Sequence, residues 1–149
     1  MQVFMIAPGG LKPLWLLVPV VLIFAVILAV LAYSLIGSRT SRFEVSADGL
    51  RIRGDLYGRF IPAESIRAEE ARRVDFSVDD GFRPSIRTFG TGLPGYQSGW
   101  YRLASGDKAL VYLTDRSKAV YVPTMVGYAL LLSPDDADAF LTALKAIPN

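Results

Sequence analysis

The chain has 149 residues, with 16 Lys and Arg, 14 Asp and Glu, and neither Cys nor His. These counts exclude a thiolate zinc site, a disulfide, a cysteine nucleophile and a Ser-His-Asp triad. The formal net charge of +2 supplies no large basic field, so nucleic acid is not an expected partner. Hydrophobic residues make up 52% of the chain, and their uneven distribution predicts how it is organised.

The N-terminal part contains 23 consecutive residues without a charged side chain, from Leu14 to Ile36. As a helix this run would be about 35 Å long, which is enough to cross the hydrocarbon core of a bilayer. Gly37 follows the last apolar residue, at a common position for a helix to stop. We therefore expect a transmembrane helix over residues 13–37, a short tail over 1–12 and a linker over 38–41.

Two other interpretations of the apolar run are a buried core helix and a cleaved signal peptide. A core helix that is apolar on all faces is unusual in so small a protein. A signal peptide normally has a shorter apolar region and a basic start, whereas here only Lys12 precedes the run. Val30-Leu31-Ala32 fits a cleavage pattern, so cleavage stays open as an alternative to the retained anchor that we expect.

Positive charges are more numerous after the apolar run than before it. Lys12 precedes the run, whereas Arg39, Arg42, Arg51 and Arg53 follow it within about 20 residues. Because Lys and Arg near a span favour the cytoplasmic side, this bias predicts a cytoplasmic C-terminal domain. We expect a single-pass protein of the cell membrane with its short tail outside.

Residues 42–149 contain several short runs in which apolar and polar side chains alternate, as in half-buried strands. Phe43 and Val45 flank Glu44, and a turn at Ala47-Asp48-Gly49 predicts a hairpin with the next run. The expected strands cover residues 43–45, 50–52, 74–78, 100–103, 108–114, 119–122 and 128–132. About seven short strands in one small domain predict a mainly β fold, either a sandwich or a partly open barrel.

The end of the chain changes from a strand period to a helical period. Ser133 is a good N-cap and Pro134 suits the first helical position. Phe140 and Leu144 are four residues apart and therefore fall on one face of a helix. We expect one amphipathic helix over residues 134–147 that caps an open end of the barrel.

The second half of the domain carries a family resemblance. The residues that carry it are Gly90 to Tyr96, Gly99 to Leu103, Lys108 to Asp115, Ala119 to Thr124, and Tyr128 to Asp136 leading into Phe140. With strands followed by one C-terminal helix, this stretch resembles a bacterial pleckstrin-homology-like (PH-like) domain family, often joined to membrane helices. The resemblance covers roughly residues 42–147. It implies a PH-like barrel and no enzymatic activity, because the family resembles a binding or assembly module without a catalytic motif. We expect no cofactor.

The glycines within this stretch also fit the spelling of a dinucleotide-binding motif. Gly90, Gly92 and Gly95 have the spacing G-x-G-x-x-G. That motif needs a helix directly after the glycines, whereas here Pro94 interrupts it and a predicted strand follows. We therefore expect a long, tightly bent loop that needs positive φ angles.

This loop supplies the candidate protein contacts. Leu93, Pro94 and Tyr96 would be exposed apolar side chains on an otherwise charged domain, and Trp100 follows them. The main hypothesis is a membrane-tethered, non-catalytic module that docks a membrane-associated protein partner or a second copy of itself through these residues.

A second hypothesis is recognition of anionic lipid headgroups, which arginines near a bilayer attract at about 1 kcal/mol each. Acidic residues such as Glu44, Asp48 and Asp55 dilute this charge. The candidate lipid contacts are Arg39, Arg42, Arg51, Arg53 and Arg59.

Overall fold

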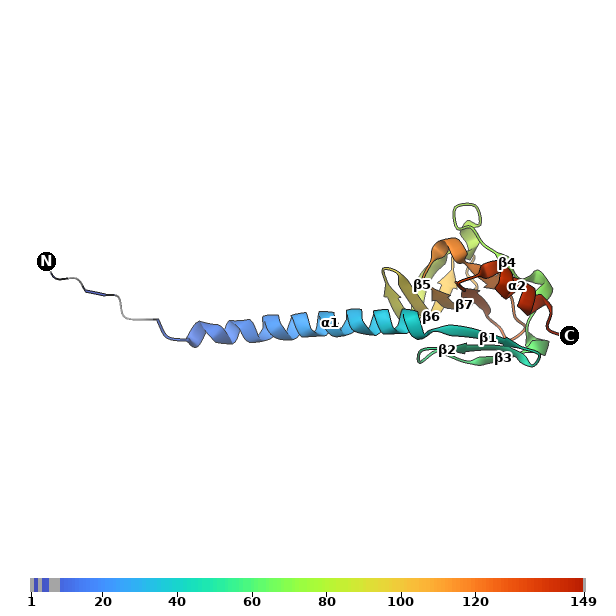
Figure 1. Ribbon diagram of the computed structural model, residues 1–149. Helices are drawn as coiled ribbons and strands as arrows, with labels where there is room; N and C mark the ends of the chain where they lie inside the picture. Colours follow the sequence, from blue (N-terminus) through green and yellow to red (C-terminus); the bar gives the residue numbers. More distant parts are fainter. Residues whose placement is uncertain (1, 3, 6–8, 149) are drawn as a thin grey trace. The chain divides into compact units, whose positions relative to one another are not determined.

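The apolar run forms one long helix in the computed structural model, which describes residues 2, 4–5 and 9–148 (Figure 1). A 3₁₀ segment, η1 (Lys12–Leu16), leads into the helix α1 (Leu17–Thr40). This helix is long and apolar enough to cross a membrane. The chain divides into two compact units, residues 1–35 and residues 36–149.

The helix α1 continues beyond its predicted end at Gly37, so most of the expected linker over residues 38–41 is helical. The hydroxyl of Thr40 donates to the carbonyl of Ile36 at 2.9 Å, and that of Ser41 donates to the carbonyl of Gly37 at 2.7 Å. These bonds satisfy carbonyl groups that a helix end leaves without partners. Gly37 has another role than stopping the helix: a Cβ there would lie 3.0 Å from the ring of Tyr96.

The first three strands after α1 form a small antiparallel sheet in the order β1-β2-β3. They are β1 (Arg42–Ser46), β2 (Gly49–Arg53) and β3 (Phe60–Pro62). The structure confirms the predicted hairpin, because Ser46 pairs with Gly49 across the turn. Gly49 has a φ of 145°, which glycine adopts without strain.

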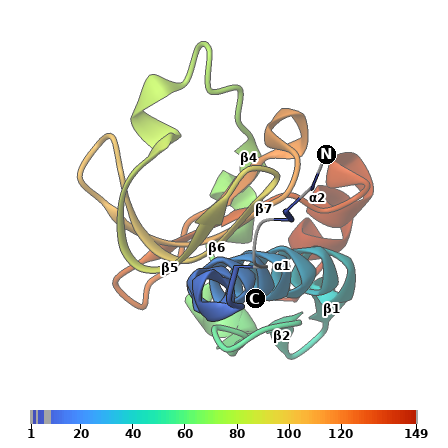
Figure 2. The same ribbon diagram turned by 90° about the vertical axis from the view of Figure 1, so that its left-hand side faces the viewer.

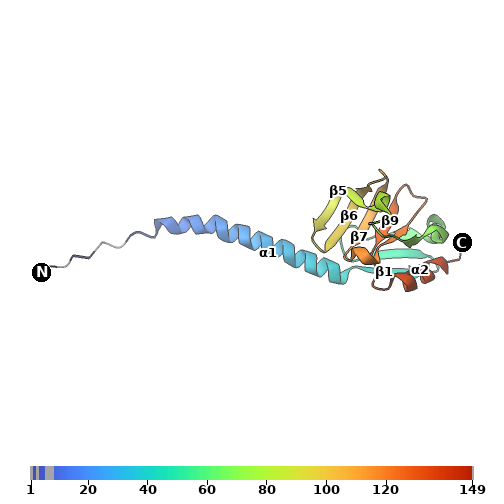
Figure 3. The same cartoon turned by 90° about the horizontal axis from the view of Figure 1, so that it is seen from above.

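The other six strands form a second sheet in the order β4-β8-β9-β7-β6-β5. Their bounds are β4 (Arg72–Arg73), β5 (Pro84–Leu93), β6 (Tyr96–Leu103), β7 (Lys108–Leu113), β8 (Val120–Val122) and β9 (Ala129–Leu132). Four short 3₁₀ segments lie between strands: η2 (Ala63–Ser65), η3 (Ala68–Glu70), η4 (Asp80–Phe82) and η5 (Arg116–Lys118). The strands β7 and β9 pair in parallel, and β5, β6 and β7 lie side by side (Figure 2, Figure 3).

The main core lies between the two sheets and the C-terminal helix. The small sheet contributes Leu50, Ile52 and Ile61, each at most 2% exposed. The large sheet contributes alternate residues such as Leu110 and Leu130, and Val111 and Leu131 face a second core on its other side. The domain is therefore mainly β and PH-like, with its central strands buried on both faces.

The C-terminal helix is shorter than predicted, because α2 covers Ala137–Lys145 rather than residues 134–147. Asp136 caps it, with its carboxylate accepting the N–H of Ala139 at 2.9 Å. The expected cap, Ser133, instead accepts the N–H of Thr114 at 2.8 Å. This contact with the end of β7 occupies Ser133, so the helix begins later.

One predicted strand is wrong. Residues 74–78 contain no strand and residues 76–78 form a turn, although Val74 and Val78 alternate with polar residues. The carboxylate of Asp75 accepts both the N–H and the hydroxyl of Ser77, at 2.9 and 2.6 Å, and this local bonding competes with strand pairing. With β3, β4 and β5 included, the described residues form nine strands rather than about seven.

Candidate functional site

The glycine-rich stretch is a tight hairpin and not the long loop predicted from the sequence. The strands β5 and β6 are joined at Pro94 and Gly95, and Gly90 lies opposite Gly99. A Cβ on Gly90 would lie 2.2 Å from the carbonyl oxygen of Ser98. The glycines at 90 and 99 therefore allow two backbones to approach closely, and no helix follows them to bind a phosphate.

The four candidate protein contacts differ in how far the structure buries them. Pro94 is exposed at the turn, and Leu93 and Trp100 are half-buried. Tyr96 is only 2% exposed, so the prediction that it offers an exposed contact is wrong. Its ring packs where a side chain at position 37 would stand, and its hydroxyl donates to the carboxylate of Asp55 at 3.1 Å.

Asp55 joins the loop after β2 to the large sheet. Its carboxylate accepts hydrogen bonds from the hydroxyls of Tyr96 and Tyr112, and from the N–H of Tyr57 at 2.9 Å. Burial raises the pKa of Tyr112, and the hydrogen bond and charge of Asp55 raise it further. Burial also raises the pKa of Tyr96. The sequence does not predict these partners of Asp55, because the two tyrosines come from distant strands.

The candidate lipid contact Arg59 lies against the candidate protein contact Trp100. The guanidinium carbon of Arg59 is 4.7 Å from the Trp100 ring centroid, and the ammonium nitrogen of Lys108 is 4.4 Å from the same centroid. The ring of Tyr128 meets Trp100 edge-on at 4.8 Å. This cluster of Arg59, Trp100, Lys108 and Tyr128 ties the segment before β3 to the large sheet.

Two further arginines of the predicted lipid contact have partners within the small sheet. Arg51 lies 5.2 Å from the Phe60 ring centroid, and Arg53 forms an ion pair with Glu44 at 3.1 Å. Arg39 and Arg42 are exposed, and neither forms an ion pair with another described residue. Of the five candidate lipid contacts, Arg39 and Arg42 are thus the two that have neither an ion pair nor an aromatic contact among the described residues.

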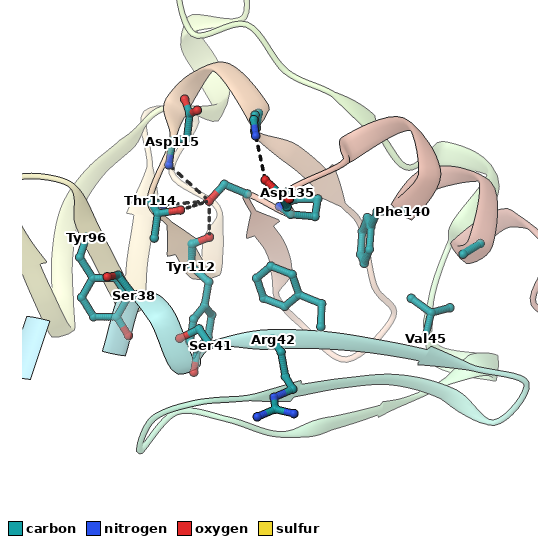
Figure 4. Close-up of a pocket in the computed structure, with 15 residues that line it drawn as sticks. Ser38, Ser41, Arg42, Val45, Tyr96, Tyr112, Thr114, Asp115, Asp135 and Phe140 are labelled. Atoms are coloured by element: carbon teal, nitrogen blue, oxygen red, sulfur yellow. Dashed lines mark hydrogen bonds and ion pairs between the residues drawn. The ribbon is translucent and has the colours of Figure 1, made fainter. Parts of the chain in front are cut away.

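The domain also has a groove of about 750 Å³ that the sequence did not predict. It runs from Tyr96 and Ser38 at one end to Val45 and Phe140 at the other, with β1 along one side (Figure 4). Thr114, Asp115 and Asp135 lie on the opposite side, and Arg42 points away from the groove (Figure 4). The complete lining is Ser38, Ser41, Arg42, Phe43, Val45, Tyr96, Tyr112, Thr114, Asp115, Lys118, Ser133, Pro134, Asp135, Phe140 and Ala143.

The floor of the groove is aromatic and its rim is polar. The Phe43 ring meets the rings of Tyr112 and Phe140 edge-on, with centroids 6.2 and 6.1 Å away. On the rim, Lys118 forms an ion pair with Asp135 at 3.0 Å. Within the described ranges 2, 4–5 and 9–148, no three acidic side chains gather as a metal site would require. An apolar floor with a polar rim suits a ligand held by contact and hydrogen bonds.

Comparison with known proteins agrees with this architecture. No curated protein and no solved structure matches the chain. The sequence profile of the family described as "Bacterial PH domain" matches residues 41–147, which is more than half of the chain and covers both sheets and α2. The chain therefore belongs to the bacterial PH domain family.

Proposed function

We propose that this protein is a membrane-tethered docking module whose groove between β1 and α2 binds a protein partner anchored in the same membrane. PH domains are generally non-catalytic interaction modules, and that general role applies to the family of this chain. The observation that carries the proposal is the 750 Å³ groove with its aromatic floor of Phe43, Tyr112 and Phe140.

The place of the groove along the chain supports a membrane-anchored partner. Ser38 lines one end of the groove and follows Ile36, the last residue of the apolar run, by two positions. A partner segment bound at Ser38 would therefore lie close to the end of the apolar run, where this chain would leave the membrane. Confinement of both proteins to one membrane raises their effective concentration, so a small contact area suffices.

Site-specific photocrosslinking tests this function. A photoreactive residue at Ala143, which lines the groove, is compared with one at Lys145, which is exposed on a different face of α2. In cells expressing the full chain, we expect a product from position 143 that contains an integral membrane protein. Phe43→Arg should abolish this product, because it places a charge on the groove floor. Equal products from both positions would contradict docking in the groove, and a product of twice the chain's mass would identify a second copy as the occupant.

A second candidate function is binding of anionic headgroups by Arg39 and Arg42, which are both exposed and form no ion pair with another described residue. It predicts that the domain of the full chain melts at a higher temperature in nanodiscs of phosphatidylglycerol than in nanodiscs of phosphatidylcholine. Added salt should remove the difference, and so should the double variant Arg39→Gln, Arg42→Gln. Equal melting temperatures in both lipids would exclude this function.

A further inference from the structure

We propose that the groove binds its partner by strand addition, in which an extended segment of the partner pairs with the free edge of β1. The segment would carry apolar side chains at every second position and belong to the juxtamembrane region of the partner. This inference rests on the proposed function and names the chemistry by which the groove recognises its ligand.

The backbone of β1 has one unpaired edge. The strand is the outer one in the order β1-β2-β3, and Ser46 pairs with Gly49 across a two-residue turn. Such a closing pair is hydrogen-bonded, and in an antiparallel ladder every second residue bonds to the neighbouring strand. The N–H and C=O groups of Phe43 and Val45 therefore point away from β2, and no hydrogen bond joins them to another described residue.

The side chains of β1 are also incompletely covered. Phe43 pairs with Ile52 and Val45 pairs with Leu50, so all four side chains face the core. Ile52 and Leu50 are 2% and 0% exposed, whereas Phe43 and Val45 are only partly buried. The core is thus open along the edge where the backbone groups are free, and an added strand would cover both.

The occupant must be a single extended chain. The groove has β1 on one side and α2 and the end of β7 on the other (Figure 4), and a single extended chain between these elements could pair with β1 along its length. A strand in this place alternates its side chains, and every second one would face the rings of Phe43, Tyr112 and Phe140.

Two substitutions at one position distinguish strand addition from side-chain docking. Val45→Pro removes the N–H that faces the groove and spares the pairing with β2, and proline is tolerated on edge strands. Val45→Ala keeps this N–H and removes more apolar surface. The probe is a peptide selected from a random displayed library for binding to the full chain in nanodiscs, and its affinity is measured by fluorescence anisotropy.

Strand addition predicts that Val45→Pro weakens probe binding about tenfold, whereas Val45→Ala weakens it less than about threefold. If Val45→Ala weakens probe binding as much as Val45→Pro does, or more, strand addition is wrong and groove docking stands. If neither variant weakens binding, or no peptide is selected, both the mode and the groove site are wrong.

A second measurement covers the case in which Val45→Pro fails to fold. The selected probe is synthesised with N-methyl groups on its odd-numbered or on its even-numbered amides. Only the amides that face β1 should be sensitive, because successive amides of a strand point in opposite directions. We expect one methylated form to lose binding about tenfold and the other to retain it. Equal loss in both forms, or in neither, would overturn strand addition.

Discussion

The guanidinium of Arg59 stacks on Trp100, with 4.7 Å between the guanidinium carbon and the ring centroid. Lys108 approaches the same ring to 4.4 Å. Two cations on one half-buried indole form cation–π interactions worth about 0.5–2 kcal/mol each. The contact therefore gives Arg59 and Trp100 a structural role that neither the lipid nor the protein hypothesis assigned to them.

A double-mutant cycle on Arg59→Gln and Trp100→Leu should show a coupling of about 0.5–1 kcal/mol in the free energy of unfolding. The measurement is denaturant unfolding of the domain in the detergent-solubilised full chain. The control cycle combines Trp100→Leu with Arg51→Gln, because Arg51 lies over Phe60 and not over Trp100. Equal coupling in the two cycles would contradict the Arg59 contact.

Asp55→Ala should be among the most destabilising changes at a partly exposed position. The carboxylate accepts hydrogen bonds from the hydroxyls of Tyr96 and Tyr112, and its removal takes this charged acceptor from both hydroxyls. Hydrogen bonds to a charged group contribute about 1.5–3 kcal/mol each, so we expect a loss of about 3 kcal/mol or more in the free energy of unfolding. Asp48→Ala, in the exposed turn between β1 and β2, is the control, and a loss no greater than its loss would show that Asp55 is dispensable.

The stability of the domain should fall at alkaline pH because of Tyr112. Burial and Asp55 raise the pKa of its hydroxyl above the ordinary value of 10.0. The stabilisation by a group with a raised pKa is complete below the unfolded pKa and is lost as the pH rises above it. The melting temperature should therefore decrease from about pH 10 upwards. Tyr112→Phe should flatten this decrease, and an unchanged slope would show that other groups cause it.

Gly99→Ala should destabilise the domain more than Gly95→Ala does. Both glycines have positive φ, 114° and 79°, so both variants carry the strain of a left-handed backbone, about 1–2 kcal/mol. A Cβ at position 99 would also lie 2.5 Å from the carbonyl oxygen of Phe89, whereas nothing lies within 4 Å at position 95. We expect a further loss of about 2 kcal/mol or more for Gly99→Ala, measured by thermal unfolding. Similar losses in the two variants would show that β5 and β6 can separate without cost.

The side of the membrane that holds the domain can be determined with single cysteines, because the chain has none. Ser105→Cys places a thiol on an exposed turn, and Gln2→Cys places one in the tail. If the domain is cytoplasmic, a membrane-impermeant maleimide should label position 105 only after lysis and position 2 in intact cells. The opposite pattern would reverse the orientation. The mass of the Gln2→Cys product also tests cleavage, since a removed signal peptide would take the thiol with it.

Local patterns determined the parts of the fold that depend on neighbouring residues. The apolar run from Leu14 to Ile36 predicts the helix, because hydrophobicity is summed along the chain. The alternation around Glu44 and the turn at Gly49 predict the first hairpin, because both signals lie within a few residues. Where local signals failed, a side chain had formed another bond: Asp75 bonds to Ser77, and Ser133 bonds to Thr114.

The candidate site depended on residues that only folding brings together. Asp55 and Tyr96 are 41 residues apart, and no pattern in the sequence indicates their hydrogen bond. The sequence places Tyr96 in a predicted loop, where its ring would be exposed. In the structure the hairpin of β5 and β6 directs this ring into the domain.

The sequence by itself determined the apolar span, the mainly β domain with one C-terminal helix, and the family. The tertiary structure alone decided which edge of β1 stays unpaired and where the groove lies. The physical reason is that hydrophobic period and turn chemistry act over a few residues, whereas a groove is the space left between β1, β7 and α2 after all of them have packed.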